Sequence, residues 1–169
     1  FFNGDESQKT VKSESVFRRS EWTHLVGRYV QPTGEISLWV DGTKQDNTTS
    51  DVFASKNGEM ALGYNIETDS EYFDGSIDNL RIYSRSLSAS EINTLYNRES
   101  VDNSALVGYW KFDKAQNQTV YDYSDFSNHG YLGSTDSPDS SDPTYLQTIS
   151  VKSENKQQVF DGFGTSLAW

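Results

Sequence analysis

The stretch FDGSIDNLRIYSRSLSASEINTLY, residues 73–96, constrains the fold of this chain more than any other part. It opens with Asp74-Gly75, a dipeptide typical of tight turns, and continues with strand-forming residues as far as Tyr83. A polar break at Ser84 ends this run. The pattern predicts a β-strand that is entered through a turn and is followed by an element of another type.

The second half of the stretch predicts a short helix. Ser88 is followed three residues later by Glu91, which is the spacing of a capping box at a helix N-terminus. Ile92, Leu95 and Tyr96 then fall on one face of the helix. We expect a helix near 88–96 that lies across the end of a sheet.

Two alternating segments upstream predict a β-hairpin. Residues 22–30 and 35–41 alternate in hydrophobicity on either side of a turn at Pro32-Thr33-Gly34. A third alternating segment, 59–65, predicts another strand. Many short strands separated by turns favour an antiparallel β-sandwich over parallel βαβ units. The predicted core face of the hairpin comprises Leu25, Tyr29, Ile36, Leu38 and Val40.

Composition supports a β-rich fold and excludes several roles. Tyrosine (10), phenylalanine (9) and tryptophan (4) are abundant, and these residues favour strands. The net charge of −11 disfavours binding to nucleic acids and to anionic membrane surfaces. The chain has no cysteine, so disulfides and thiolate metal sites are excluded. No stretch approaches the apolar length of a transmembrane helix, and we expect no membrane insertion.

Three motifs occur in the order found in one known family. They are residues 21–26, residues 36–42, and residues 73–83 with the Leu-Ser-x-x-Glu-Ile helix that follows. In these motifs the chain resembles the laminin-G-like (LamG) domains, whose fold is the concanavalin A-like jelly roll. The resemblance implies an all-β antiparallel β-sandwich that binds carbohydrate or protein and often carries a structural calcium ion.

The order of the motifs leaves two domain organisations open. Residues 1–97 resemble the C-terminal part of a LamG-like domain, whereas residues 105–133 resemble its beginning. Either two tandem domains are each cut, or a strand at 106–112 docks beside 77–83 and completes one sandwich over residues 1–133. The first and last strands of a jelly roll are neighbours, and little chain follows Gly133, so we favour the second organisation.

The C-terminal part has a different character. Residues 134–145 are rich in Ser, Asp and Pro and predict a linker. Residues 158–169 resemble the opening of the catalytic domain of family-thirty glycoside hydrolases, particularly the endo-β-1,6-galactanase-like branch. The resemblance implies that residues 146–169 are the truncated start of such a domain. The catalytic glutamates of these enzymes lie on later barrel strands, so we expect an internal fragment without catalytic residues.

Calcium is the metal that the acidic residues favour. Asp78, Asp122 and Asn128 would converge if the late loop packs beside the strand at 77–83. Carboxylate, amide and carbonyl oxygens suit a structural Ca²⁺. The alternative is that Asp78 faces solvent and Asp122 only caps a turn, which is a common role for Asp.

Sugar binding requires exposed aromatic faces beside polar groups. Trp39 alternates away from the predicted core face of the hairpin, so we expect it to be exposed and to bind carbohydrate. Tyr64 and Tyr72 flank a polar loop and are further candidates. The alternative for each is packing against a second sheet. We expect Trp22 and Trp110 in the core.

Together these features lead us to expect a non-catalytic accessory module of a secreted, extracellular or cell-surface glycoside hydrolase. It would bind a polysaccharide, galactan-like by the resemblance of the tail, and carry a structural calcium ion. The alternatives are a protein-binding or adhesive module and a passive spacer, because a fold alone does not decide function.

Overall fold

The computed structural model describes residues 11–13, 21–45, 49–50, 60–63, 72–113, 118–133, 137–138, 140, 142–143 and 166–167. These residues form mostly strands in antiparallel sheets, with one short helix, and the all-β prediction is confirmed. The chain divides into two compact units. In the described part of the chain, no helix has the length and apolar character needed to cross a membrane.

The first unit is built on the predicted hairpin. Its sheet contains β1 (Leu25–Val30), β2 (Glu35–Val40), β3 (Thr43–Lys44) and β4 (Thr49–Ser50). β1 and β2 pair antiparallel with Leu25 opposite Val40 and Val30 opposite Glu35. Gly34 completes the turn between them with a φ of 69°, and its N–H donates to the Val30 carbonyl over 2.8 Å. Because β3 and β4 both pair with β2, β2 is the central strand.

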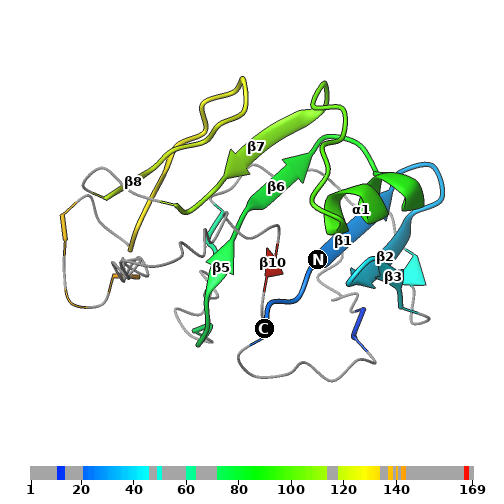
Figure 1. The fold of residues 1–169 in the computed structure, drawn as a ribbon, viewed down its shortest axis with the longest axis horizontal. Coiled ribbons are helices and arrows are strands. Elements are labelled where there is room, and N and C mark those ends of the chain that lie inside the picture. The colour runs from blue at the N-terminus through cyan, green and yellow to red at the C-terminus, as the bar shows by residue number, and fades with distance from the viewer. Residues whose placement is uncertain are drawn as a thin grey trace, which may run out of the picture. The chain divides into compact units, whose positions relative to one another are not determined.

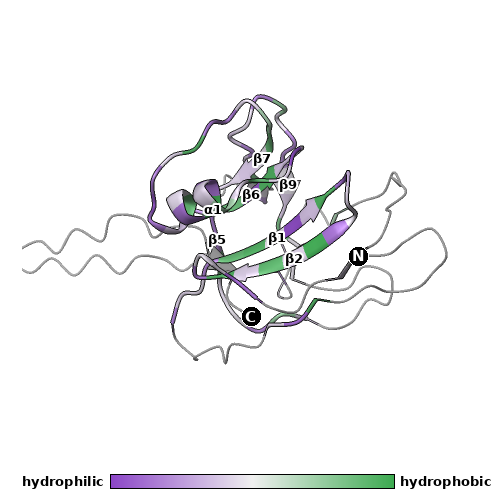
Figure 2. Cartoon of the chain, turned by 90° about the vertical axis from the view of Figure 1, so that its right-hand side faces the viewer, coloured by the Kyte–Doolittle hydropathy of each residue, from purple (hydrophilic) through white to green (hydrophobic). Residues whose placement is uncertain are grey.

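The central strand is covered on both faces. Ile36 and Val40 are buried on the predicted core face, and Ser37 and Trp39 are buried on the other. Figure 2 shows hydrophobic residues interleaved with hydrophilic ones along β1 and β2. The predicted exposure of Trp39 is therefore wrong, since only 7% of this residue is exposed. Alternation assigns a residue to a face of the sheet but does not say whether that face is covered.

Trp22 corrects a second prediction, because 45% of it is exposed although we expected it in the core. The paired register of the hairpin begins at Leu25, opposite Val40, so Trp22 precedes the sheet and has no cross-strand neighbour there. The predicted strand at 59–65 is also wrong where it can be checked. Its described residues, 60–63, lie outside any strand, and Gly63 has a φ of 88°.

The helix α1 (Ala89–Tyr96) forms as predicted. Ser88 is its N-cap: the Glu91 N–H donates to Ser88 Oγ over 3.2 Å, and the Ser88 N–H donates to Glu91 Oε2 over 2.8 Å. Ile92 and Leu95 are buried. α1 lies close to the turn between β2 and β3, where a Cβ atom on Gly42 would come within 2.5 Å of Asn93 Oδ1. The expected capped helix at the end of a sheet is confirmed.

The predicted strand at 77–83 is split in two. Asn79 adopts a φ of 52° between β5 (Ile77–Asp78) and β6 (Leu80–Tyr83). β5 pairs with β10 (Ser166–Leu167). A left-handed residue breaks the extended backbone, and Asn is one of the few residues that adopts this conformation readily.

The second unit contains β6, β7 (Leu106–Trp110), β8 (Thr119–Val120) and β9 (Gly130–Tyr131). β6 and β7 pair antiparallel, and they lie side by side in Figure 1. Leu106, Gly108 and Trp110 are buried on one face of β7, which confirms that Trp110 is a core residue. The β6–β7 pair is the arrangement that a single sandwich over 1–133 requires, and the domain limits themselves stay a prediction.

Candidate ligand-binding loop

A buried carboxylate organises the loop at residues 122–128, which we call the 122–128 loop. Asp122 Oδ1 accepts the N–H groups of Tyr109 over 2.7 Å and of Ser124 over 2.8 Å. Asp122 Oδ2 accepts the Ser124 hydroxyl over 2.7 Å and the Asn128 N–H over 2.9 Å. Each oxygen thus receives two donors, so one side chain fixes both ends of the loop.

Further hydrogen bonds attach this loop to β7. The Tyr123 N–H donates to the Tyr109 carbonyl over 2.8 Å, beside the isolated bridge between Trp110 and Asp122. Trp110 Nε1 donates to the Asn128 carbonyl over 3.0 Å, and Asn128 Nδ2 donates to the Val107 carbonyl over 2.9 Å. The loop is therefore held against a strand at its beginning and at its end.

These bonds set the protonation of Asp122. Burial is the largest single influence and on its own would raise the pKa of the carboxyl group. The N–H groups of Ser124, Tyr109 and Asn128 and the Ser124 hydroxyl together outweigh it and hold the pKa of Asp122 below its usual value. Asp122 is consequently ionised at neutral pH, and its charge strengthens the bonds that hold the loop.

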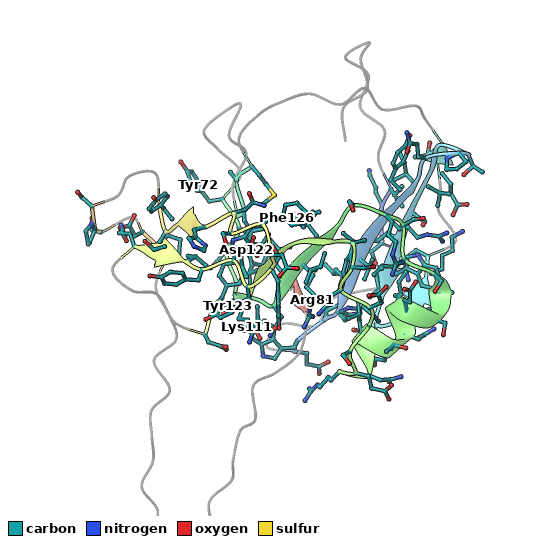
Figure 3. All side chains as sticks on the ribbon, turned by 90° about the horizontal axis from the view of Figure 1, so that it is seen from above. Tyr72, Arg81, Lys111, Asp122, Tyr123 and Phe126 are labelled. Carbon is teal, nitrogen blue, oxygen red and sulfur yellow. The ribbon has the colours of Figure 1, made fainter. Side chains whose placement is uncertain are left out.

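The loop presents two aromatic rings to solvent. Tyr123 is 50% exposed and Phe126 is 61% exposed. Their backbones belong to the same network, because the Phe126 N–H donates to Ser124 Oγ over 3.3 Å. Figure 3 labels both rings together with Asp122. Exposed rings on a fixed backbone form a surface on which the apolar face of a ligand can stack.

Two cations lie against the aromatic pair formed by Tyr109 and Tyr123, whose ring centroids are 6.3 Å apart in an edge-to-face arrangement. The Arg81 guanidinium carbon lies 4.2 Å from the centre of the Tyr109 ring, and Arg81 Nη2 donates to Tyr109 Oη over 2.9 Å. Lys111 Nζ lies 4.6 Å from the Tyr123 ring centre and 5.5 Å from that of Tyr109. Both distances are within the range of cation–π attraction.

The structure brings together two of the three residues expected to bind calcium. Asp122 and Asn128 are joined by a hydrogen bond. Asp78 belongs to a different network, where its carboxylate accepts Asn79 Nδ2 over 2.8 Å and Asn79 Oδ1 accepts the Tyr109 hydroxyl over 2.7 Å. Burial is the largest influence and raises the pKa of Asp78, and the nearby charge of Asp113 acts in the same direction, whereas the hydrogen bonds from Asn79 and the charge of Arg81 act against it.

The donor set around Asp122 does not fit a calcium ion. Calcium needs carboxylate lone pairs, and those of Asp122 already accept N–H and O–H groups. Among the residues that the structure describes, no three or more His, Cys, Asp or Glu side chains gather in a metal-binding group. The geometry matches the alternative in which Asp122 stabilises a turn.

The residues expected to bind sugar lie apart from this loop. Trp39 is buried, Tyr64 lies outside the described residues, and Tyr72 is 70% exposed in the first unit. Tyr123 and Phe126 were missed because sequence reasoning weighed Asp122 as a calcium ligand or as a turn cap and did not ask which neighbouring side chains such a turn would expose. The pattern Asp122-x-Ser124 is typical of an Asp-stabilised turn, and it would have indicated that the neighbouring rings are displayed.

Trp39 lies on a buried face of the hairpin together with the polar residues Arg28 and Ser37, and not on an exposed surface. Arg28 lies opposite Ser37 in the hairpin register, and Trp39 follows two residues later on the same face. Within the described part of the chain, Arg28 Nε, Ser37 Oγ and Trp39 Nε1 are buried without hydrogen-bond partners. Since both Ser37 and Trp39 are buried, this group offers no accessible ring for stacking.

The antiparallel sheets and the capped helix of the described residues are consistent with a concanavalin A-like β-sandwich. A Laminin G family model, described as the concanavalin A-like lectin/glucanases superfamily, matches residues 1–93, and the chain belongs to this superfamily. No curated protein and no solved structure matches the chain significantly. The comparisons give no support to the glycoside hydrolase resemblance of residues 158–169. The 122–128 loop lies outside the matched residues.

Proposed function

We propose that this chain is a non-catalytic carbohydrate-binding module and that the 122–128 loop is its binding surface. The observation that carries the proposal is the display of Tyr123 and Phe126 on a loop fixed by Asp122. Pyranose rings stack on exposed aromatic faces. A loop that is ordered before binding loses little entropy when the ligand arrives, which favours affinity.

The proposal also covers the parent protein and the location in which the module acts. The module would serve a secreted glycoside hydrolase whose catalytic domain follows in the sequence, and it would act outside the cell or at its surface. This part depends on the resemblance of residues 158–169, which lie mostly outside the described part of the chain. A galactan-like polysaccharide is the ligand class that this resemblance implies, and structural calcium would have to bind to residues other than Asp122.

Affinity gel electrophoresis across a panel of soluble polysaccharides tests the proposal. Retardation by at least one polysaccharide is expected, and Tyr123→Ala and Phe126→Ala should each weaken it about twofold to tenfold, as the loss of one aromatic contact predicts. Tyr131→Ala is the matched control, because Tyr131 is an exposed tyrosine on β9 outside the loop. Equal losses in all three variants, or none in the loop variants, would contradict the assignment of the site.

A protein-binding or adhesive role is the main alternative. Tyrosine and other large rings also dominate protein interfaces, so the loop would suit that role as well. Failure to bind any glycan, together with capture of a partner protein that Phe126→Ala abolishes, would favour this alternative. A chain that binds neither would act as a spacer.

A further inference from the structure

We propose that the 122–128 loop recognises an acidic glycan, one whose sugar units carry a carboxylate or sulfate group. This inference rests on the proposed carbohydrate-binding function and deepens it. It is carried by the two cations, Arg81 and Lys111, that lie against the Tyr109–Tyr123 pair, of which Tyr123 is an exposed ring of the loop (Figure 3).

Lys111 differs from the paired cations of the first unit. There, Lys44 binds Glu35 over 2.8 Å, and Arg85 forms an ion pair with Glu91. Among the described residues, no carboxylate lies within ion-pair distance of Lys111 Nζ, which lies over the rings of Tyr109 and Tyr123. A cation–π contact holds an ammonium group in place but leaves its charge uncompensated. Lys111 is therefore available to an anion from outside the chain.

The second cation, Arg81, lies on β6 directly opposite Tyr109 of β7. Stacking on the Tyr109 ring and the bond to its hydroxyl fix the plane of the guanidinium. A guanidinium carries five N–H donors, and the Tyr109 hydroxyl takes only one bond of 2.9 Å. The planar group can thus present further donors to a carboxylate or sulfate, and Asp78 offsets part of its charge.

The negative charge of the whole chain opposes the binding of an acidic glycan, so the two cations Arg81 and Lys111 must supply the attraction locally. A net charge of −11 repels polyanions at long range; Asp113 is exposed two residues after Lys111, and Asp125 is exposed in the 122–128 loop itself. Net charge therefore cannot drive the binding of an acidic glycan, and recognition would depend on the positions of Lys111 and Arg81. Stacking on Tyr123 and Phe126 would supply the uncharged part of the affinity.

Titration calorimetry with oligogalacturonates tests the inference, because methyl esterification removes the charge and keeps the sugar backbone. Wild-type protein should bind the free acid at least about tenfold more tightly than the methyl ester or a neutral galactan oligosaccharide, as one charge-assisted contact predicts. Lys111→Gln should lose about fivefold to tenfold in affinity for the acid, and Lys111→Arg should keep it within about twofold. Lys44→Gln removes the same charge from the other unit and should have no effect.

The outcomes separate this inference from the function on which it rests. Equal binding of acid, ester and galactan, unchanged by Lys111→Gln but lost with Phe126→Ala, would overturn the acidic specificity and leave carbohydrate binding intact. Preference for a sulfated over an unsulfated galactan, lost in Lys111→Gln, would support the inference with sulfate as the anion. Binding of no polysaccharide at all, charged or neutral, would overturn both proposals.

Discussion

At the scale of single residues, the side chain of Asp122 holds the conformation of the 122–128 loop. Its two oxygens accept four hydrogen bonds, three from backbone N–H groups and one from the Ser124 hydroxyl. The sequence analysis singled out Asp122 and predicted a role for its carboxylate oxygens. It did not show whether the oxygens face a metal ion or the chain's own donors, because that depends on the path of the backbone between Asp122 and Asn128.

The first prediction concerns the amide variant of this residue. Asp122→Asn replaces one acceptor oxygen by a donor that faces other donors, so the free energy of unfolding should fall by about 3 kcal/mol. Urea denaturation with and without added Ca²⁺ measures the loss. The loss should be the same in both conditions, because Asp122 has no lone pair left for calcium. A loss that appears only in the presence of calcium would show that Asp122 is a metal ligand.

The second prediction concerns pH. Because the folded state holds the pKa of Asp122 below its value in the unfolded chain, about 3.9, its ionised form contributes stability above that value. This contribution should disappear as the pH falls from about 5 through the folded-state pKa. The stability difference between wild type and Asp122→Asn should therefore shrink on acidification. A difference that stays constant between pH 7 and pH 3 would contradict the assigned role.

The third prediction separates the ring of Trp39 from its N–H group. Trp39 is buried, but its N–H has no hydrogen-bond partner in the described part of the chain. Trp39→Phe should therefore change the free energy of unfolding by less than about 1.5 kcal/mol, whereas Trp39→Ala should cost about 3–5 kcal/mol. Glycan binding should survive in Trp39→Phe. Loss of binding in this variant, with unchanged stability, would restore Trp39 as a sugar ligand.

At the scale of elements, the sequence was informative where the signal is local. The turn at 32–34 and the capping box at Ser88 each lie within a few residues, and both elements appear with nearly the predicted bounds. The break at Asn79 was missed because a positive φ leaves little trace in a hydrophobicity pattern. The burial of Trp39 was missed for a different reason: it depends on contacts across the sheet rather than on neighbours in the sequence.

The fourth prediction belongs to α1. Ser88→Ala removes the N-cap oxygen that accepts the Glu91 N–H and should cost about 1 kcal/mol of stability. Ser90→Ala is the control, because Ser90 is an exposed residue inside the helix, where Ala has the higher helix propensity. This variant should be neutral or slightly more stable. Equal destabilisation of both variants in urea would mean that the cap is not what starts the helix.

At the scale of the whole molecule, membership of the superfamily rests on residues 1–93, whereas the proposed binding surface lies in the second unit. Sequence reasoning predicted the fold because three motifs and several short alternating strands agree with it. It could not predict the site, because the 122–128 loop gains its form from β7, more than ten residues earlier in the chain. Such long-range pairing is not encoded in any local pattern.

A nuclear magnetic resonance titration tests the central claim most directly. Adding an oligosaccharide of the bound polysaccharide to ¹⁵N-labelled protein reports which backbone amides sense the ligand. The largest shifts should fall on residues 109–111 and 122–128, and the amides of β1 and β2 should change little. Shifts concentrated on the β1–β2 hairpin, with the 122–128 loop unaffected, would contradict the account.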